Sequence, residues 1–185
     1  MIYERPDLDG PLRQGEIFTG LRRAKLDLSA IEREVIQVNF EDFPFAILLE
    51  QDCDLEQHHR ASLNQIAPDK LLPDFSFLPA VPFETFRGAL ARDILKRIVA
   101  NKDERYHVIE QVPVEQDTAG QGLPALGVDF KRHFSMPAGE VSLRLRDRSA
   151  VRRSRLATPW AEHLSTRRAY FAARVGLPRD HDVRP

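Results

Sequence analysis

Residues 43–49 read FPFAILL, seven apolar residues in succession. Successive side chains of a β-strand point to opposite faces, so an unbroken apolar run is typical of a strand buried on both faces. Pro44 stands near the beginning of the run, where a strand tolerates a residue without a backbone N–H. The stretch therefore predicts the central strand of a sheet.

Other segments predict the strands around this one. Residues 35–40 alternate between apolar and polar, as a half-buried strand does, and only two polar residues separate them from the central strand, so the two runs predict a hairpin. Residues 66–83 hold four prolines among apolar residues. Such density predicts an extended or irregular connection lying on the core, with a partner-binding loop as the alternative. Further strand-like runs are residues 15–18, 106–112, 126–130 and 140–145.

Two segments have helical periodicity. Between residues 83 and 101, apolar side chains recur every three or four positions, which predicts one long helix inserted between strands. Residues 158–175 predict a C-terminal helix with Thr158 as its N-cap, Pro159 in its first turn and Gly176 at its stop. Strands and helices in this order predict an α+β fold.

Composition sets limits on the class of protein. The chain has 185 residues, of which 42% are hydrophobic and 30% charged, and this fits a single domain over residues 1–185, with an Arg-rich segment and helix at 144–178. No apolar run approaches the roughly 18 residues that cross a bilayer. The first residues lack the basic and apolar parts of a secretory leader. A single cysteine forms no internal disulfide. These features predict a domain that works in the cytoplasm, away from membranes.

Charge is divided unevenly along the chain. Residues 144–185 carry 11 arginines against four acids, a net charge of +7, whereas residues 1–143 carry a net charge of −8. Arg152, Arg153 and Arg155 are the candidates for binding a partner. Arginine suits phosphate geometry, but no aromatic residues interleave with these arginines to stack on bases. We therefore expect them to pair with the acidic part of the chain or with a protein partner, and nucleic acid is the alternative.

The stretch QDCDLEQHH, residues 51–59, follows the central strand and crowds carboxylates, the only cysteine and two histidines. Asp52 and Asp54 are candidates for a Mg²⁺ or Mn²⁺ site, with His58 as a further ligand. Zinc is disfavoured because a second cysteine is lacking, and a reactive Cys53 is disfavoured because the flanking carboxylates suppress a thiolate. In the structural interpretation, Cys53 is buried behind the strand, Asp54 caps a helical turn that begins at Leu55, and Asp52 accepts backbone N–H groups of the same turn. A contact surface for another macromolecule is the third interpretation.

Several segments resemble the PemK/MazF-type family of bacterial toxins. They are RQGEI at residues 13–17, the apolar strand at 45–49, GVDFKRHFS at 127–135 and the helix at 158–175. The resemblance implies a partly open SH3-like β-barrel and a place in a toxin–antitoxin or phage-defence locus. The chain also resembles a group of uncharacterised bacterial proteins that share the Q-D-C-D-L turn. In the toxins an arginine precedes the central strand and serves RNA cleavage, whereas an acidic turn here would repel the phosphate, so the resemblance favours the fold over the activity.

The sequence therefore predicts an α+β domain built on a partly open SH3-like β-barrel, with one long inserted helix and a C-terminal helix. It predicts a bacterial interaction or regulatory module that has a protein partner and needs no cofactor. The alternative is a nuclease or hydrolase that uses Asp52 and Asp54 to bind Mg²⁺ or Mn²⁺.

Overall fold

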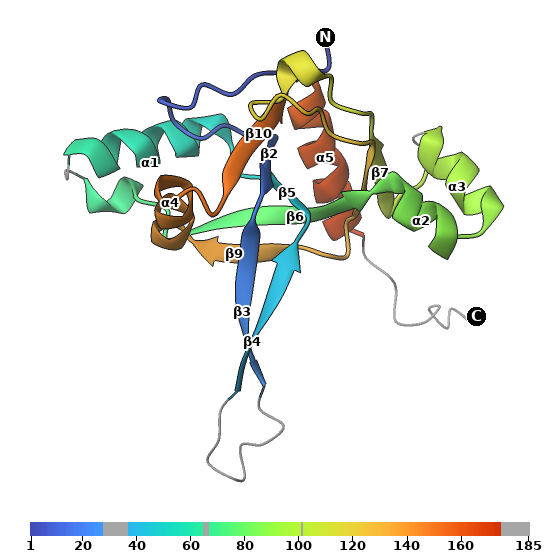
Figure 1. Cartoon of the computed structure of the whole chain (residues 1–185), viewed down its shortest axis with the longest axis horizontal. Helices are drawn as coiled ribbons and strands as arrows, with labels where there is room; N and C mark the ends of the chain where they lie inside the picture. The colour runs from blue at the N-terminus through green and yellow to red at the C-terminus, as the bar shows by residue number, and fades with distance from the viewer. Residues whose placement is uncertain (28–36, 65–66, 101, 175–185) are drawn as a thin grey trace, which may run out of the picture.

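The computed structural model describes residues 1–27, 37–64, 67–100 and 102–174 (Figure 1). Its main sheet is antiparallel and strongly curled into a half-barrel, with the strand order β1-β10-β2-β5-β6-β8-β7 and with β9 paired to β6. The strands of this sheet are β1 Tyr3–Glu4, β2 Glu16–Thr19, β5 Phe45–Leu48, β6 Asp74–Pro82, β7 Tyr106–Ile109, β8 Leu126–Asp129, β9 Phe134–Pro137 and β10 Val151–Leu156.

The helices lie around this sheet. They are α1 Asp52–Asn64, α2 Phe83–Ala89, α3 Arg92–Val99, α4 Ala138–Arg146 and α5 Trp160–Ala172. Figure 1 shows α1 and α4 together at one end, α2 and α3 at the other, and α5 behind the middle of the sheet. The predicted α+β class is confirmed, and none of the helices in the described ranges is long and apolar enough to cross a membrane.

The central strand is confirmed as β5, which lies between β2 and β6. Ala46, Ile47 and Leu48 are all completely buried. Ile47 belongs to a core cluster that includes Leu164 of α5, whereas Ala46 and Leu48 belong to a second cluster that includes residues of α1 and α4. Alternate side chains of the strand therefore fill two cores, one on each face of the sheet.

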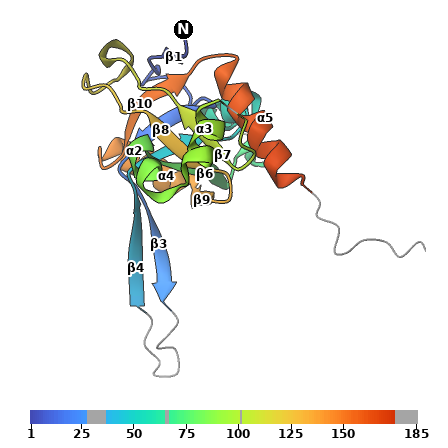
Figure 2. The same cartoon turned by 90° about the vertical axis from the view of Figure 1, so that its right-hand side faces the viewer.

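Strands β3 (Leu21–Asp27) and β4 (Gln37–Phe43) form a separate two-stranded sheet, here called the arm. The arm projects away from the half-barrel in both views (Figures 1 and 2). Gly20 connects β2 to the arm with a φ of +80°, and a Cβ at this position would lie 2.0 Å from the carbonyl oxygen of Ser149. Only glycine fits this bend, which turns the chain out of the main sheet.

The predicted hairpin of residues 35–40 with residues 43–49 is wrong. In the register of the arm, Phe40 of β4 lies opposite Ala24 of β3. Only Pro44 separates β4 from β5, and a single residue is too short for a hairpin loop, so the chain runs from the arm directly into the main sheet. Residues 35 and 36 of the predicted strand lie outside the described residues.

The proline-rich segment is more regular than predicted. Residues 74–82 form β6, the longest strand of the main sheet, which pairs with β5 along one edge. Along its other edge, residues 74–77 pair with β9 and residues 80–82 pair with β8. Pro79 lies in the interval between these two partners, so its missing N–H removes no ladder bond on that edge. β6 therefore accommodates Pro79 within a regular strand.

The single long helix predicted over residues 83–101 is two helices, α2 and α3. The chain is extended at the break, where Leu90 has φ −118° and ψ 148°. Phe86 anchors α2 by lying over Gly127, where a Cβ would come within 2.6 Å of its ring, and Ile98 anchors α3 in complete burial. The apolar residues of the two helices keep one spacing, with Phe83 and Phe86 half-buried in α2 and Ile98 buried in α3, so periodicity alone does not reveal the break.

The predicted strand at residues 140–145 is also wrong, because this segment belongs to α4. Ala138 and Val141 of α4 are buried three residues apart, whereas Leu143 is 53% exposed. Glu140 and Arg144 form an i,i+4 ion pair of 2.7 Å that only a helix permits. Val141, Leu143 and Leu145 alternate with polar residues in the sequence, but they lie in a helix and not in a strand. β9 and β10, on either side of α4, were not predicted.

The C-terminal helix is confirmed as α5, but its start differs from the prediction. Pro159 occupies the N-cap position, and no side-chain hydrogen bond caps the helix. Thr158 instead donates a hydrogen bond of 2.8 Å from Oγ1 to the carboxylate of Glu162. Leu164 of α5 is buried, whereas Trp160 is 42% exposed. Gly176, the predicted stop, lies outside the described residues.

Candidate functional site

The acidic turn after β5 begins a helix, and its first residue ties that helix to two other parts of the chain. Asp52, the first residue of α1, accepts a hydrogen bond of 2.7 Å from the backbone N–H of Gln14 and another of 2.7 Å from the guanidinium of Arg155. Each oxygen of the carboxylate has one of these partners. Asp52 accepts a backbone N–H, but the prediction that its donors lie in the same turn is wrong, because Gln14 belongs to the segment before β2.

The other residues of the turn are placed differently from the structural interpretation. Cys53 is exposed, so its predicted burial is wrong. Asp54 is also exposed and lies in the first turn of α1, so it caps no helix that begins after it. His58 accepts a hydrogen bond of 2.9 Å at Nδ1 from the backbone N–H of Leu72, and burial lowers the pKa of His58. In the part of the chain that the structure describes, no three His, Cys, Asp or Glu side chains gather as a metal site would require.

Glu50, just before the turn, was not singled out in the sequence. One oxygen of its carboxylate accepts a hydrogen bond of 2.6 Å from the backbone N–H of Ser76, and the other is buried without a hydrogen-bond partner. Burial raises the pKa of Glu50 above its usual value. The oxygen without a partner leaves the charged form of this carboxylate only partly compensated. Glu50 is not among the residues that line the cleft described below.

The three candidate arginines of β10 are bonded within the chain. Arg152 makes two hydrogen bonds of 2.6 Å to the carboxylate of Glu16, and the side chains are 6% and 0% exposed. Arg153 makes two of 2.7 Å to Asp117. Arg155 contacts Asp52 at 2.7 Å and Glu4 at 2.6 Å. The expected pairing of these arginines with the acidic part of the chain is confirmed, although we did not predict that they form a strand.

Burial and these pairs also shift the pKa values of their carboxylates. Burial raises the pKa of Asp117, but the hydrogen bonds from Arg153 and from the backbone N–H groups of Gln121 and Ala119 outweigh burial and lower it to about 2. Burial of Glu16 raises its pKa, against the opposite effect of Arg152. The arginines of β10 therefore connect this strand to β2, to the segment around Asp117 and to the N-terminal segment through ion pairs.

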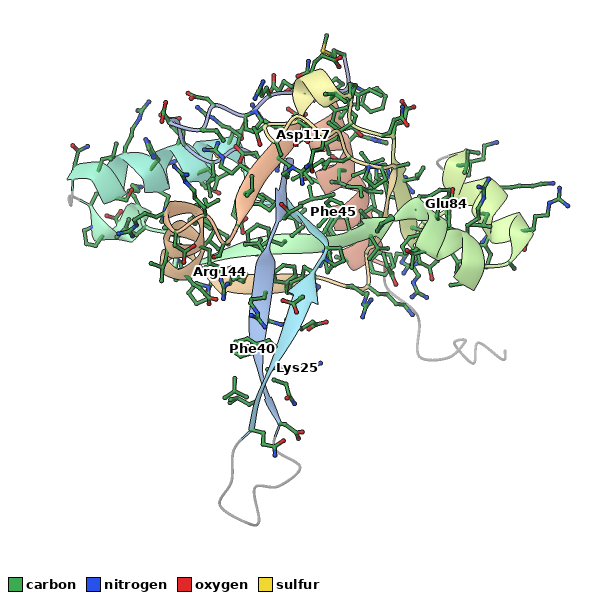
Figure 3. All side chains as sticks on the ribbon, in the orientation of Figure 1. Lys25, Phe40, Phe45, Glu84, Asp117 and Arg144 are labelled. Atoms are coloured by element: carbon green, nitrogen blue, oxygen red, sulfur yellow. The ribbon has the colours of Figure 1, made fainter. Side chains whose placement is uncertain are left out.

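The arm has an exposed apolar surface, which the ion pairs of β10 do not cover. Residues opposite each other in its register share a face, so Ala24 and Phe40 lie together, followed by Leu26 and Val38. Leu26 is 60% exposed, Val38 51% and Phe40 54%. Figure 3 shows Phe40 on the arm, away from the half-barrel. We call this side of the arm the outer face.

A pair of charged residues borders the outer face at its base. The guanidinium carbon of Arg22 lies 4.3 Å from the centre of the Phe40 ring, and the Nε of Arg22 lies 3.2 Å from a carboxylate oxygen of Asp42. The guanidinium therefore stacks on the aromatic ring and pairs with a carboxylate at once. The outer face is an apolar strip with an aromatic and an arginine at one end.

The opposite side of the arm, here called the inner face, continues the second core. Leu21 and Phe43 at its base are buried in that core, and the rings of Phe43 and Phe134 are stacked with their centres 3.7 Å apart. Further out the inner face is polar, with Arg23 bonded to Glu41 at 2.7 Å and Lys25 opposite Asn39. The arm thus turns its polar side toward the body and its apolar side toward solvent.

A cleft of about 430 Å³ lies between the inner face, β6 and the turn that precedes β9. Arg23, Lys25 and Glu41 line it from the arm, and Arg132 and His133 line it from the turn. Its apolar lining comes from Pro44, Pro79, Val81 and the two stacked phenylalanines. The hydrogen bond from Arg23 lowers the pKa of Glu41, and the charges of Lys25 and Arg132 lower it further.

Part of the arm was visible in the sequence in another form. Residues 37–40 of the predicted strand were correctly interpreted, but their apolar side was assigned to the core. The basic residues of β3 gave no signal, because the apolar residues of LRRAKLD stand at positions 21, 24 and 26 and lack the regular alternation of a strand. Comparison of the chain with protein-family models, with curated proteins and with solved structures found no match.

Proposed function

We propose that this protein is an interaction module that binds a partner protein through the arm. The observation that carries the proposal is the inverted polarity of the arm. In a free-standing domain, the side of a hairpin that continues the core is apolar and the side that faces solvent is polar. Here the outer face exposes half or more of Leu26, Val38 and Phe40, and such a strip is typical of a surface that another molecule covers.

The physical character of the arm favours a protein as that molecule. The described part of the arm has three basic residues and three acidic residues, so it offers no excess charge to a phosphate backbone. A two-stranded ribbon is also a poor membrane anchor, because the unpaired N–H and C=O groups of its open edges would be unsatisfied in hydrocarbon. A protein partner covers the apolar strip and pairs with an open strand edge at the same time.

The composition of the outer face fits a protein interface as well. Phenylalanine and arginine are enriched in the cores of such interfaces. Phe40 with Arg22 stacked on it supplies a rigid aromatic and a delocalised cation in one place. We expect this pair to form the centre of the contact, with Leu26 and Val38 beside it.

The proposal retains the wider setting that the sequence implied. In this setting the half-barrel is an SH3-like barrel, and the module works in the bacterial cytoplasm as part of a toxin–antitoxin or phage-defence locus, as the PemK/MazF-like resemblance implies. The antiparallel curled sheet and the closing helix α5 support this proposal. The metal-dependent alternative has no comparable support, because Asp52 is bonded to Gln14 and Arg155, and Asp54, two positions further along α1, does not share a helix face with it.

Site-specific cross-linking would test the proposal. A photo-reactive amino acid replaces Phe40 on the outer face or, as the matched control, Tyr170, an exposed aromatic residue of α5 outside the arm, and the protein is irradiated in the cells that produce it. We expect one protein to cross-link from position 40 and not from position 170. That protein is then purified, and its binding to the purified chain is measured by titration calorimetry.

Two paired variants decide whether the outer face makes the complex. Leu26→Ser with Phe40→Ser should weaken the complex by at least about 30-fold, since a buried aromatic anchor contributes 2 kcal/mol or more. Leu63→Ser with Tyr170→Ser, at exposed apolar positions outside the arm, should leave the affinity unchanged. Equal affinity of the outer-face variant and the unaltered chain would overturn the proposal, as would equal cross-linking from both positions. Recovery of a second copy of this chain would identify the partner as itself.

A further inference from the structure

The cleft on the inner face has more positive charge than its own carboxylates neutralise. Arg23, Lys25 and Arg132 surround Glu41, whose carboxylate bonds only to Arg23. The second carboxylate of the lining, Asp42, pairs with Arg22 on the outer face. Within the described residues, Lys25 and Arg132 have no ion-pair partner of their own. Three cations therefore share one carboxylate.

The form of the cleft suits a segment of extended chain. Its volume of about 430 Å³ falls within the range of about 300–1,000 Å³ that ligand pockets occupy. Pro79 and Val81 of β6 are half-buried and give it an apolar floor. Lys25 and Arg132 are exposed and stand at its rim on two different elements. An occupant would place an apolar side chain on the floor and an anionic group between the two cations.

We propose that this cleft binds a carboxylate-bearing segment of the partner protein, which takes the place of Glu41 on Arg23. This inference rests on the proposed function, because the occupant belongs to the protein that covers the arm. Glu41 itself shows that a carboxylate fits these cations, through its 2.7 Å contact with Arg23. A thin two-stranded arm is accessible from both sides, so a partner that clasps it covers the outer face and fills the cleft together.

The charge balance favours carboxylates over a nucleic-acid strand as the occupant. Glu41 and the exposed Asp42 both stand in the lining and would repel a chain that carries a phosphate at every residue. A peptide with one or two spaced carboxylates meets Lys25 and Arg132 and brings fewer negative charges near Asp42 than a nucleic-acid strand does. The phenylalanines of the lining, Phe43 and Phe134, are buried and stacked on each other, so they offer no free ring to a base.

Titration by NMR would test the cleft in the full-length protein. The probe is a hexapeptide of alternating glutamate and serine, and the matched probe has glutamine in place of glutamate. We expect the acidic peptide alone to shift the amide signals of residues 22–25 and 130–133. Lys25→Gln with Arg132→Gln should weaken its binding by about five- to tenfold, the effect of losing two exposed charge contacts. Lys70→Gln with Lys96→Gln, which changes the net charge equally but away from the cleft, should leave the binding unchanged.

Glu41→Gln is the most decisive variant, because it should strengthen binding of the acidic peptide, whereas Lys25→Gln with Arg132→Gln should weaken it. The substitution frees Arg23 and removes the internal competitor, so the acidic peptide should bind about threefold or more tightly, while the neutral peptide is unaffected. No tightening in Glu41→Gln, or equal binding of the two peptides, would overturn the proposal. Tighter binding of a single-stranded oligouridylate at the same amides would overturn it in favour of nucleic acid. Leu26→Ser with Phe40→Ser should retain peptide binding, so failure of the cleft and failure of the outer face are separate results.

Discussion

The ion pair between Arg152 and Glu16 joins β10 to β2 inside the protein. Arg152 also donates hydrogen bonds to the carbonyl oxygens of Leu8, Gly10 and Pro11, which fixes the N-terminal segment. Arg152→Met would leave the buried carboxylate unpaired and should lower the free energy of unfolding by about 3–5 kcal/mol. Arg146→Met, at an exposed position, should change it by less than about 0.5 kcal/mol. Urea unfolding measures both.

The pH dependence of the stability lost in Arg152→Met tests whether the unpaired carboxylate of Glu16 causes the loss. Burial already raises the pKa of Glu16, and removal of Arg152 removes the hydrogen bond that lowers it. A raised pKa in the folded state contributes stability that is present at low pH and is lost as pH rises through it. The Arg152→Met variant should therefore lose less stability near about pH 5 than near about pH 8. A loss that does not vary with pH would assign the effect to packing.

Cys53 gives a second test at the residue scale. The structure places this thiol on the exposed side of the first turn of α1, beside Gln51 and Asp54. A thiol reagent should therefore modify it in the native protein at a rate within about tenfold of that in denaturant, since no unfolding is required for access. Cys53→Ala should change the free energy of unfolding by less than about 0.5 kcal/mol. Slow native modification would show that the thiol is covered.

At the scale of elements, α5 is held to β7 through one buried histidine. Arg167 of α5 lies 2.6 Å from Nδ1 of His107 and donates to the carbonyl oxygen of Tyr106 at 3.2 Å. Burial, together with the charge of Arg167, lowers the pKa of His107 to about 3. His107 is therefore neutral in the folded protein, and its ring nitrogen accepts the hydrogen bond from the guanidinium.

This attachment predicts a slope of stability with pH. The unfolded chain binds a proton at this histidine below about pH 6.5, whereas the folded chain does not. Stability is thus present above that pH and falls as pH is lowered from about 6.5 toward 4, by up to about 1.4 kcal/mol per pH unit. His107→Gln keeps an acceptor for Arg167 and should remove this part of the slope in urea unfolding. His133→Gln, at an exposed position, should keep it, and equal slopes for unaltered chain and His107→Gln would contradict the prediction.

Elements were predictable where burial alone decides them. The run of β5 is apolar on both sides, so its central position followed from the sequence. Pairing partners did not follow, because β3 and β5 offer equally plausible neighbours to β4 and only the single residue Pro44 distinguishes them. α4 was mistaken for a strand because the contacts that select the helix, those of Ala138 and Val141 with the second core, come from distant parts of the chain. β10 was missed for a related reason, since its inward arginines are buried only because carboxylates such as Glu16 neutralise them.

At the scale of the whole molecule, the body and the arm are stabilised in different ways. The strands of the body share two cores that lie on the two faces of one sheet. The arm joins the second core only at its base, through Leu21 and Phe43. Beyond that base its two strands hold each other by backbone pairing and by the ion pairs of Arg22 and Arg23, and an isolated two-stranded ribbon is marginally stable in water. The outer part of the arm should therefore open without unfolding the body.

Native-state hydrogen exchange would measure this difference. Amides of Ala24, Leu26 and Phe40 should exchange through local opening, with protection at least about 100-fold below that of Ile47 and Leu78 in the body, which require global unfolding. Leu26→Ser with Phe40→Ser should not alter the protection of the body, because these side chains contribute no burial to it. Adding the partner should raise the protection of the arm toward that of the body, since the complex pairs its edges and covers its apolar strip. If the arm is already as protected as Ile47 in the purified chain, and loses that protection on dilution, a second copy already covers it.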